Sequence, residues 1–339
     1  MSGPDATPFA AAAAPPSHGE VIPANEPAAT RAILAIVEAK LREAAKTGPA
    51  RRDAHPKAHG CVRATFRVLD ALPDALRVGV FAEPREFQAW IRFSNGSPVP
   101  QPDTKGDARG MAIKLMDVAG SASGTQDFVL ISAPVFIVRD AADYLDLETA
   151  PAFWRFFIPG FNPLRFRLHE ARNAFAILRS STANLLTNRY WSMSPYRCGE
   201  IACKYGARPV GSASSRGATS QPDYLRGNLR ADLAERAAAF DFMIQPRGDP
   251  ATMPIEDPTI LWDETLAPFI PVARIAIPLQ TLDDPADLAF CEALSFTPWH
   301  CLDVHRPLGG INRVRRAVYD LVSSLRHAIN RTERREPTG

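Results

Sequence analysis

The feature that most constrains the fold is a series of short apolar segments separated by turn clusters. In residues 61–68 every second side chain is apolar, the two-residue period of a strand with one buried face. Gly, Pro, Asn and Ser clusters interrupt the series and mark turns. Short strands at this spacing predict an antiparallel barrel or sandwich. The predicted strands are residues 61–68, 76–81, 86–93, 110–116, 127–131, 135–138, 199–204, 240–245 and 274–279.

Three other segments have the apolar spacing of helices, namely residues 27–47, 162–179 and 310–330. With the strands they predict an α+β protein. Residues 1–26 are rich in Ala and Pro with almost no large apolar residues, which predicts a disordered tail. No linker long enough to separate two domains follows, so residues 27–332 are predicted to form one domain, and residues 333–339 a flexible C-terminus.

The last predicted helix carries an unusual stripe of side chains. At 100° per residue, Arg315, Tyr319 and Arg326 fall within about 40° of one another, beside a broader apolar arc. Such Arg/Tyr pairs are ordinary on helices, and the stripe could simply border solvent. A ferric haem is also a suitable partner, because a tyrosine can bind its iron as a phenolate and an arginine one turn away stabilises that anion.

Several separated fragments give this second interpretation its weight. The fragments are Arg52-Asp-Ala-His55, Arg92-Phe-Ser94, Asp107-Ala-Arg109-Gly110, Pro134-Val-Phe136-Ile-Val-Arg139-Asp140 and Arg315-Arg-Ala-Val-Tyr319. They occur in the same order and at the same spacing as in the haem catalases, which this chain resembles over roughly residues 27–330. The resemblance is strongest to the small catalase-related haem proteins, a group that includes the coral allene oxide synthase and the bacterial mini-catalases.

The resemblance implies an antiparallel β-barrel of catalase type with surrounding helices, and a haem b buried between the barrel and the C-terminal helix. It implies that His55 is the distal acid/base, that Ser94 fixes its tautomer, and that Tyr319 binds the iron. His59, four residues after His55, is a competing candidate for the distal histidine. The other residues implied to contact the haem are Arg52, Arg92 and Arg326 at its propionates, together with Ile131, Phe136, Tyr144 and Arg315.

One position departs from the catalase pattern. Full catalases carry an asparagine where this chain has Ile131, and an isoleucine cannot hold hydrogen peroxide by hydrogen bonds. The sequence therefore favours a haem peroxidase that reduces organic hydroperoxides with a small electron donor and has weak catalase activity. A fatty-acid hydroperoxide isomerase or lyase, and a haem-binding protein without turnover, are the alternatives.

Composition bounds the remaining possibilities. A formal net charge of +2 does not indicate a nucleic-acid-binding surface. No apolar run is long enough for a transmembrane helix. The five cysteines are dispersed, which favours free thiols in a reducing cytoplasm. The oligomeric state stays open, with a homo-oligomer among the candidates.

Overall fold

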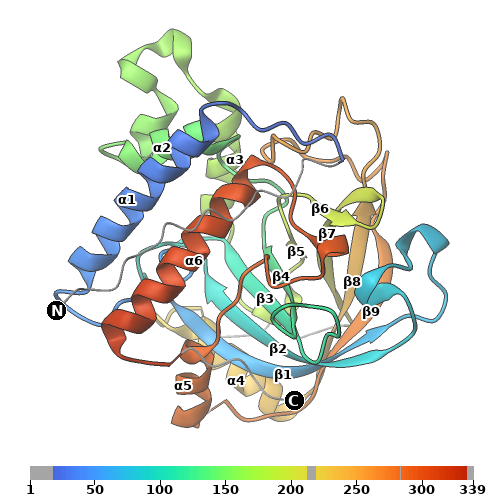
Figure 1. The fold of residues 1–339 in the computed structure, drawn as a ribbon. Helices are drawn as coiled ribbons and strands as arrows, with labels where there is room; N and C mark the ends of the chain where they lie inside the picture. The colour runs from blue at the N-terminus through green and yellow to red at the C-terminus, as the bar shows by residue number, and fades with distance from the viewer. Residues whose placement is uncertain (1–17, 212–218, 283, 334–339) are drawn as a thin grey trace, which may run out of the picture.

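The computed structural model describes residues 18–211, 219–282 and 284–333 (Figure 1). Its helices are α1 (Glu26–Ala44), α2 (Ala141–Thr149), α3 (Leu168–Leu178), α4 (Tyr224–Glu235), α5 (Pro285–Ala293) and α6 (Gly310–Asn330). Its strands are β1 (Ala58–Val68), β2 (Glu86–Asn95), β3 (Arg109–Leu115), β4 (Gln126–Ile131), β5 (Tyr190–Trp191), β6 (Tyr196–Cys198), β7 (Ile201–Val210), β8 (Ala238–Pro246) and β9 (Ile270–Ile277).

Eight of these strands close into an antiparallel barrel. They are hydrogen-bonded in the order β5-β4-β3-β2-β1-β9-β8-β7, and pairing of β7 with β5 closes the ring. The remaining strand, β6, extends β7 as a hairpin. Fully buried aromatic rings from different strands meet in the core, among them Phe66, Phe128, Tyr205 and Phe242. The predicted α+β fold with an antiparallel barrel and surrounding helices is confirmed.

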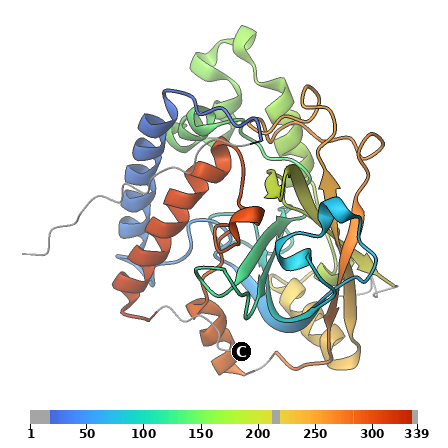
Figure 2. The ribbon, with the colours of Figure 1, turned by 45° about the vertical axis from the view of Figure 1, so that its right-hand side comes forward.

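A layer of helices covers one side of the barrel. In both views α6 runs beside α1 (Figures 1 and 2). Ile33 and Val37 of α1 pack against Val314 and Val318 of α6 in one buried cluster. The apolar arc of the predicted C-terminal helix therefore faces protein, and the adjacent Arg315–Tyr319 stripe faces the barrel side.

Several predicted elements were wrong. Residues 76–81 form no strand but belong to two 3-10 turns, Asp74–Leu76 and Gly79–Phe81, and Gly79 at the start of the second takes φ +56°. Residues 135–138 form no strand. The predicted helix over 162–179 begins only at Leu168, because Pro159 and Pro163 hold the preceding chain in short 3-10 turns. Helices α2, α4 and α5 were not predicted at all.

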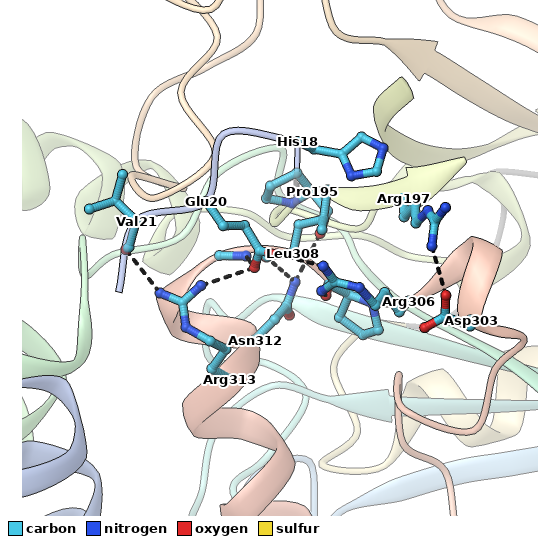
Figure 3. A network of polar contacts seen from close by, with 12 residues as sticks. His18, Glu20, Val21, Pro195, Arg197, Asp303, Arg306, Leu308, Asn312 and Arg313 are labelled. Atoms are coloured by element: carbon cyan, nitrogen blue, oxygen red, sulfur yellow. Dashed lines mark hydrogen bonds and ion pairs between the residues drawn. The ribbon is translucent and has the colours of Figure 1, made fainter. Parts of the chain in front are cut away.

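The predicted disordered tail needs a correction where it overlaps the described residues. Within residues 18–26, Glu20 and Glu26 are buried, and Glu20 is only 9% exposed. Its carboxylate accepts from Arg306 Nη2 at 2.8 Å, Gly309 N at 2.9 Å and Arg313 Nη1 at 3.0 Å (Figure 3). Residues 1–17 lie outside the described part, as do 334–339 of the predicted flexible C-terminus.

This acidic contact fixes the start of α6. Glu20 and Glu256 accept from the backbone N–H groups of Gly309 and Gly310, donors that have no acceptor within the helix. Negative charge at a helix N-terminus also opposes the helix dipole. The N-terminal segment therefore helps to set the position of the helix that carries Tyr319.

Candidate functional site

A cavity of about 570 Å³ lies between the barrel and α6, within the usual size of a cofactor or ligand site. Strands β2, β3 and β4 supply one wall, and α6 supplies the opposite wall. All ten residues predicted from the sequence line it: Arg52, His55, Arg92, Ser94, Ile131, Phe136, Tyr144, Arg315, Tyr319 and Arg326.

His55 is held from three sides in the loop before β1. Its backbone takes φ +58°, an uncommon conformation for a non-glycine residue and frequent at functional sites. Arg92 Nη2 donates to the His55 carbonyl at 2.8 Å, and His55 Nδ1 lies 3.1 Å from Ser94 Oγ. The ring rests on Gly110, where a Cβ would come within 2.7 Å of Nδ1.

The electrostatic surroundings keep this imidazole neutral. Burial lowers the pKa of His55 to about 4, and the guanidiniums of Arg92 and Arg315 act in the same direction. At neutral pH the ring therefore carries a free lone pair. With Ser94 Oγ accepting from Nδ1–H, that lone pair sits on Nε2.

The competing histidine has a different place. His59 lies on β1 with an exposed fraction of 1% and contributes nothing to the cavity lining. Its Nε2 lies 2.7 Å from Asn95 Oδ1, in a buried network with Asp103 and Arg109. Of the two candidates, the structure brings only His55 to the cavity.

On the opposite wall, Arg315 supports the Tyr319 phenol. Arg315 Nη2 donates to Tyr319 Oη at 3.2 Å. Arg315 Nη1 donates to Asn312 Oδ1 at 3.1 Å and to Ser194 Oγ. Burial acts to lower the pKa of Arg315, but attraction to Tyr319, Tyr196 and Tyr144, together with the hydrogen bond to Tyr319, raises that pKa. The pair thus places a guanidinium against the phenol oxygen at this wall.

A third group places positive charge at one end of the cavity. Arg52, Arg92 and Arg326 gather there with a single carboxylate, Glu292 of α5. Burial and repulsion by Arg52 lower the pKa of Arg92, and the same two causes lower the pKa of Arg326 to about 10. The Nε atoms of Arg92 and Arg326 are buried without a partner among the described residues. Three guanidiniums against one carboxylate leave two positive charges to be matched.

These residues fit a haem b. The excess of two charges and the unpartnered Nε atoms suit two propionates, which arginine binds well. The supported phenol is one of the oxygen ligands that ferric haem takes. The neutral imidazole stands at the opposite, barrel-side wall.

The wall around Ile131 is apolar. Val129, Phe136, Ile177 and Met193 line the cavity with it. Ser132, the nearest polar neighbour in sequence, accepts from Arg109 N at 2.8 Å and lines a smaller, separate cavity. Tyr144 also lines the main cavity, and burial raises its pKa, so it remains a protonated phenol.

Sequence reasoning missed Gly110 and Asp53, which line the cavity, and Glu292, which contacts Arg52 and Arg326. Gly110 belongs to one of the fragments that resemble catalases, but nothing except its missing side chain indicated that the His55 ring packs against it. Asp53 also lines the cavity, and burial with repulsion by Glu148 raises its pKa to about 6. Glu292 gave no signal, because α5 itself was not predicted.

Comparison with known proteins gives a consistent result. The family model described as Catalase matches residues 36–151. A curated catalase-related peroxidase of Mycolicibacterium paratuberculosis is 28% identical over 273 residues, which span 74% of this chain and 81% of that protein.

Solved catalases share the fold. A fungal catalase superposes with a TM-score of 0.64 at 17% identity, covering 85% of this chain and 61% of its own. Catalase A of Saccharomyces cerevisiae superposes with a TM-score of 0.64 at 18% identity, covering 88% of this chain and 67% of its own. The chain thus spans only about three fifths of the fungal catalase's length. The chain therefore has the fold of the catalases, and its sequence is similar to the Catalase family model and to a catalase-related peroxidase.

Proposed function

We propose that the protein is a haem-dependent peroxidase that reduces organic hydroperoxides with electrons from a small donor, and that its catalase activity is weak. The observation that carries the proposal is the neutral, buried His55 facing a cavity whose opposite wall holds the Arg315-supported Tyr319. The similarity to a protein named catalase-related peroxidase supports the same reaction class.

Tyr319 is the proposed iron ligand, and Arg52, Arg92 and Arg326 are the proposed partners of the propionates. When bound, the haem supplies the iron centre at which the O–O bond of the peroxide is cleaved and the electron store that the donor refills. Arg315 orients the Tyr319 oxygen through the hydrogen bond at 3.2 Å. Asn312 and Ser194 fix Arg315 in turn.

His55 moves the proton. Its Nε2 accepts the hydroperoxide proton and returns it to the oxygen that leaves with the alkyl group, so that an alcohol is released. Ser94 keeps the ring in the tautomer with a basic Nε2. The overall reaction takes two electrons and two protons from the donor and gives the alcohol and water.

The apolar wall selects the substrate. A bulky hydroperoxide can bury its alkyl group against Ile131 and Phe136, at about 25 cal/mol per Å² of apolar surface removed from water. Hydrogen peroxide has no such surface, and Ile131 offers it no hydrogen bond. The proposal therefore places organic hydroperoxides ahead of hydrogen peroxide as substrates.

The test compares the haem-loaded protein with its His55→Ala variant in steady-state turnover of cumene hydroperoxide and an aromatic donor. General acid–base catalysis contributes roughly 10²–10⁴-fold, so the variant should keep its haem spectrum and lose a factor of that order in kcat/KM. His59→Ala is the matched control and should keep most of the rate. If the protein consumes hydroperoxide as fast without the donor as with it, it is instead an isomerase or lyase. If it turns over no hydroperoxide at all, it is a haem-binding protein without catalytic activity.

A further inference from the structure

One surface of the molecule stands out from the rest by its exposed apolar side chains. Of the fourteen large hydrophobic residues exposed in the described part of the chain, eight lie between residues 153 and 178. We call the region from Phe153 to Arg179 the 153–179 surface. Its segment projects from the top of the molecule, away from the barrel (Figures 1 and 2). Its exposed members are Phe153, Trp154, Phe161, Leu164, Phe166, Leu168, Phe175 and Leu178.

The same segment is strongly basic. It contains five arginines and one acidic residue, Glu170, which is buried and paired with Arg139. Arg167 is neutralised by Asp143 and Asp146. For the other four arginines (Arg155, Arg165, Arg172 and Arg179), no ion pair is formed within the described residues.

The arginines and aromatic rings are interleaved. The Arg155 guanidinium stands 3.5 Å from the centroid of Phe161 and 5.3 Å from that of Trp154. Arg179 stands 5.1 Å from the ring of Phe175. Exposed aromatic and aliphatic groups among unpaired cations are typical of surfaces that insert into the headgroup region of an anionic bilayer.

The surface is continuous with the cavity. Phe153 and Leu178 belong to both, since each lines the cavity and is about half exposed. Ala174 and Ile177 of α3 continue the apolar path inward. Whatever apolar phase covers the 153–179 surface is therefore in contact with the rim of the cavity.

We propose that the 153–179 surface binds an anionic phospholipid bilayer and holds the rim of the cavity against it. Bound in this way, the protein receives hydroperoxides carried on membrane acyl chains directly from the lipid; this second part depends on the proposed peroxidase function. A second copy of the chain is a poorer occupant, because a two-fold interface places the same patch on both partners. It would set unpaired arginines against unpaired arginines.

The test measures sedimentation of the full-length, haem-loaded protein with vesicles of phosphatidylcholine alone and of a two-to-one mixture of phosphatidylcholine and phosphatidylglycerol. The mixed vesicles should bind the protein at least tenfold more tightly, and added salt should weaken that binding, because each cation near an anionic surface contributes about fivefold.

Two paired variants remove the two parts of the surface separately. Trp154→Ser with Phe161→Ser removes the apolar anchors, and Arg165→Glu with Arg172→Glu reverses the charge. Each should reduce binding to the mixed vesicles at least tenfold. The matched controls are Leu266→Ser and Arg67→Glu, which change similarly exposed side chains elsewhere and should leave binding unchanged.

The outcomes separate this proposal from the proposed function. Vesicle binding needs no turnover, so a protein that binds but does not reduce hydroperoxides refutes only the function. None of the substituted residues lines the cavity, so turnover of dissolved cumene hydroperoxide should be the same in every variant. Equal binding of the wild type to both kinds of vesicle would overturn the proposal. So would a dimer in solution that Trp154→Ser with Phe161→Ser dissociates while neither protein binds vesicles.

Discussion

Gly110→Ala should displace the His55 ring and so lower the rate, although His55 itself is not substituted. A Cβ at this position would lie 2.6 Å from Ser94 Oγ, 2.7 Å from His55 Nδ1 and 2.9 Å from His55 Cε1. Nonbonded heavy atoms prefer a separation of about 3.5–4.0 Å. The imidazole must therefore retreat by about 1 Å, since Gly110 sits in β3, paired with Ser94 of β2 and Ile131 of β4, and has little freedom to yield.

The expected loss follows from this displacement. A misplacement of about 1 Å in a catalytic group can cost about 10²-fold in rate, so kcat/KM for cumene hydroperoxide should fall by roughly that factor. Haem content should be unchanged, because Tyr319 and the arginine cluster lie on other elements. Adding Ser94→Ala removes one of the clashing atoms but not the His55 ring, so the double variant should stay impaired.

The assay is steady-state peroxidase turnover with the haem absorption spectrum recorded on each preparation. Gly227→Ala is the matched control, because a Cβ there meets nothing within 4 Å and the residue lies in α4. It should retain full activity and gain about 0.5–1 kcal/mol in stability. Full activity in Gly110→Ala would show that the contact with His55 does not govern the reaction.

The other predictions concern the ligand, the base, the distal wall and the charged end of the cavity. Tyr319→Phe should lose most of its haem, and an unchanged spectrum would remove Tyr319 as the ligand. The pKa of His55 is about 4 in the folded chain against about 6.5 unfolded; kcat/KM should therefore hold down to about pH 5 and fall below it. Because the unfolded chain then binds more protons at this residue between pH 4 and 6.5, the contribution of His55 to the free energy of unfolding should rise with pH across that window, which urea titrations of the wild type and His55→Ala at several pH values would check. Ile131→Asn should shift the kcat/KM ratio towards hydrogen peroxide dismutation, and an unmoved ratio would contradict the role of the apolar wall. Arg326→Gln should weaken haem binding about tenfold or more, since a hydrogen bond to a charged group is worth about 1.5–3 kcal/mol; equal affinity in haem titrations would count against the propionate contact.

The sequence by itself predicted those strands and helices whose apolar residues recur at a clear spacing within the segment. Alternation in residues 61–68 predicted β1, because one face of that strand packs into the barrel with Val62, Phe66 and Val68 fully buried. The apolar arc of α6 predicted its bounds, since the same arc packs against α1. The prediction failed where the spacing of apolar residues fits more than one kind of element. Residues 76–81 are an example, because their apolar side chains pack into the core from 3-10 turns rather than from a strand.

The sequence also supplied ten candidate site residues, but not their arrangement. The motifs named ten residues, and all ten line one cavity. The Arg52-x-x-His55 spacing favoured His55 over His59 but left His59 as a competing candidate, because sequence spacing does not show what surrounds a side chain after folding. The tertiary structure brings only His55 to the cavity. His55 takes a left-handed backbone conformation held by Arg92 and packs its ring on Gly110, whereas the His59 ring lies on β1 and is hydrogen-bonded to Asn95. Likewise Glu292 meets Arg52 and Arg326 only because α5 packs beside them, a long-range contact that no local pattern in the chain encodes.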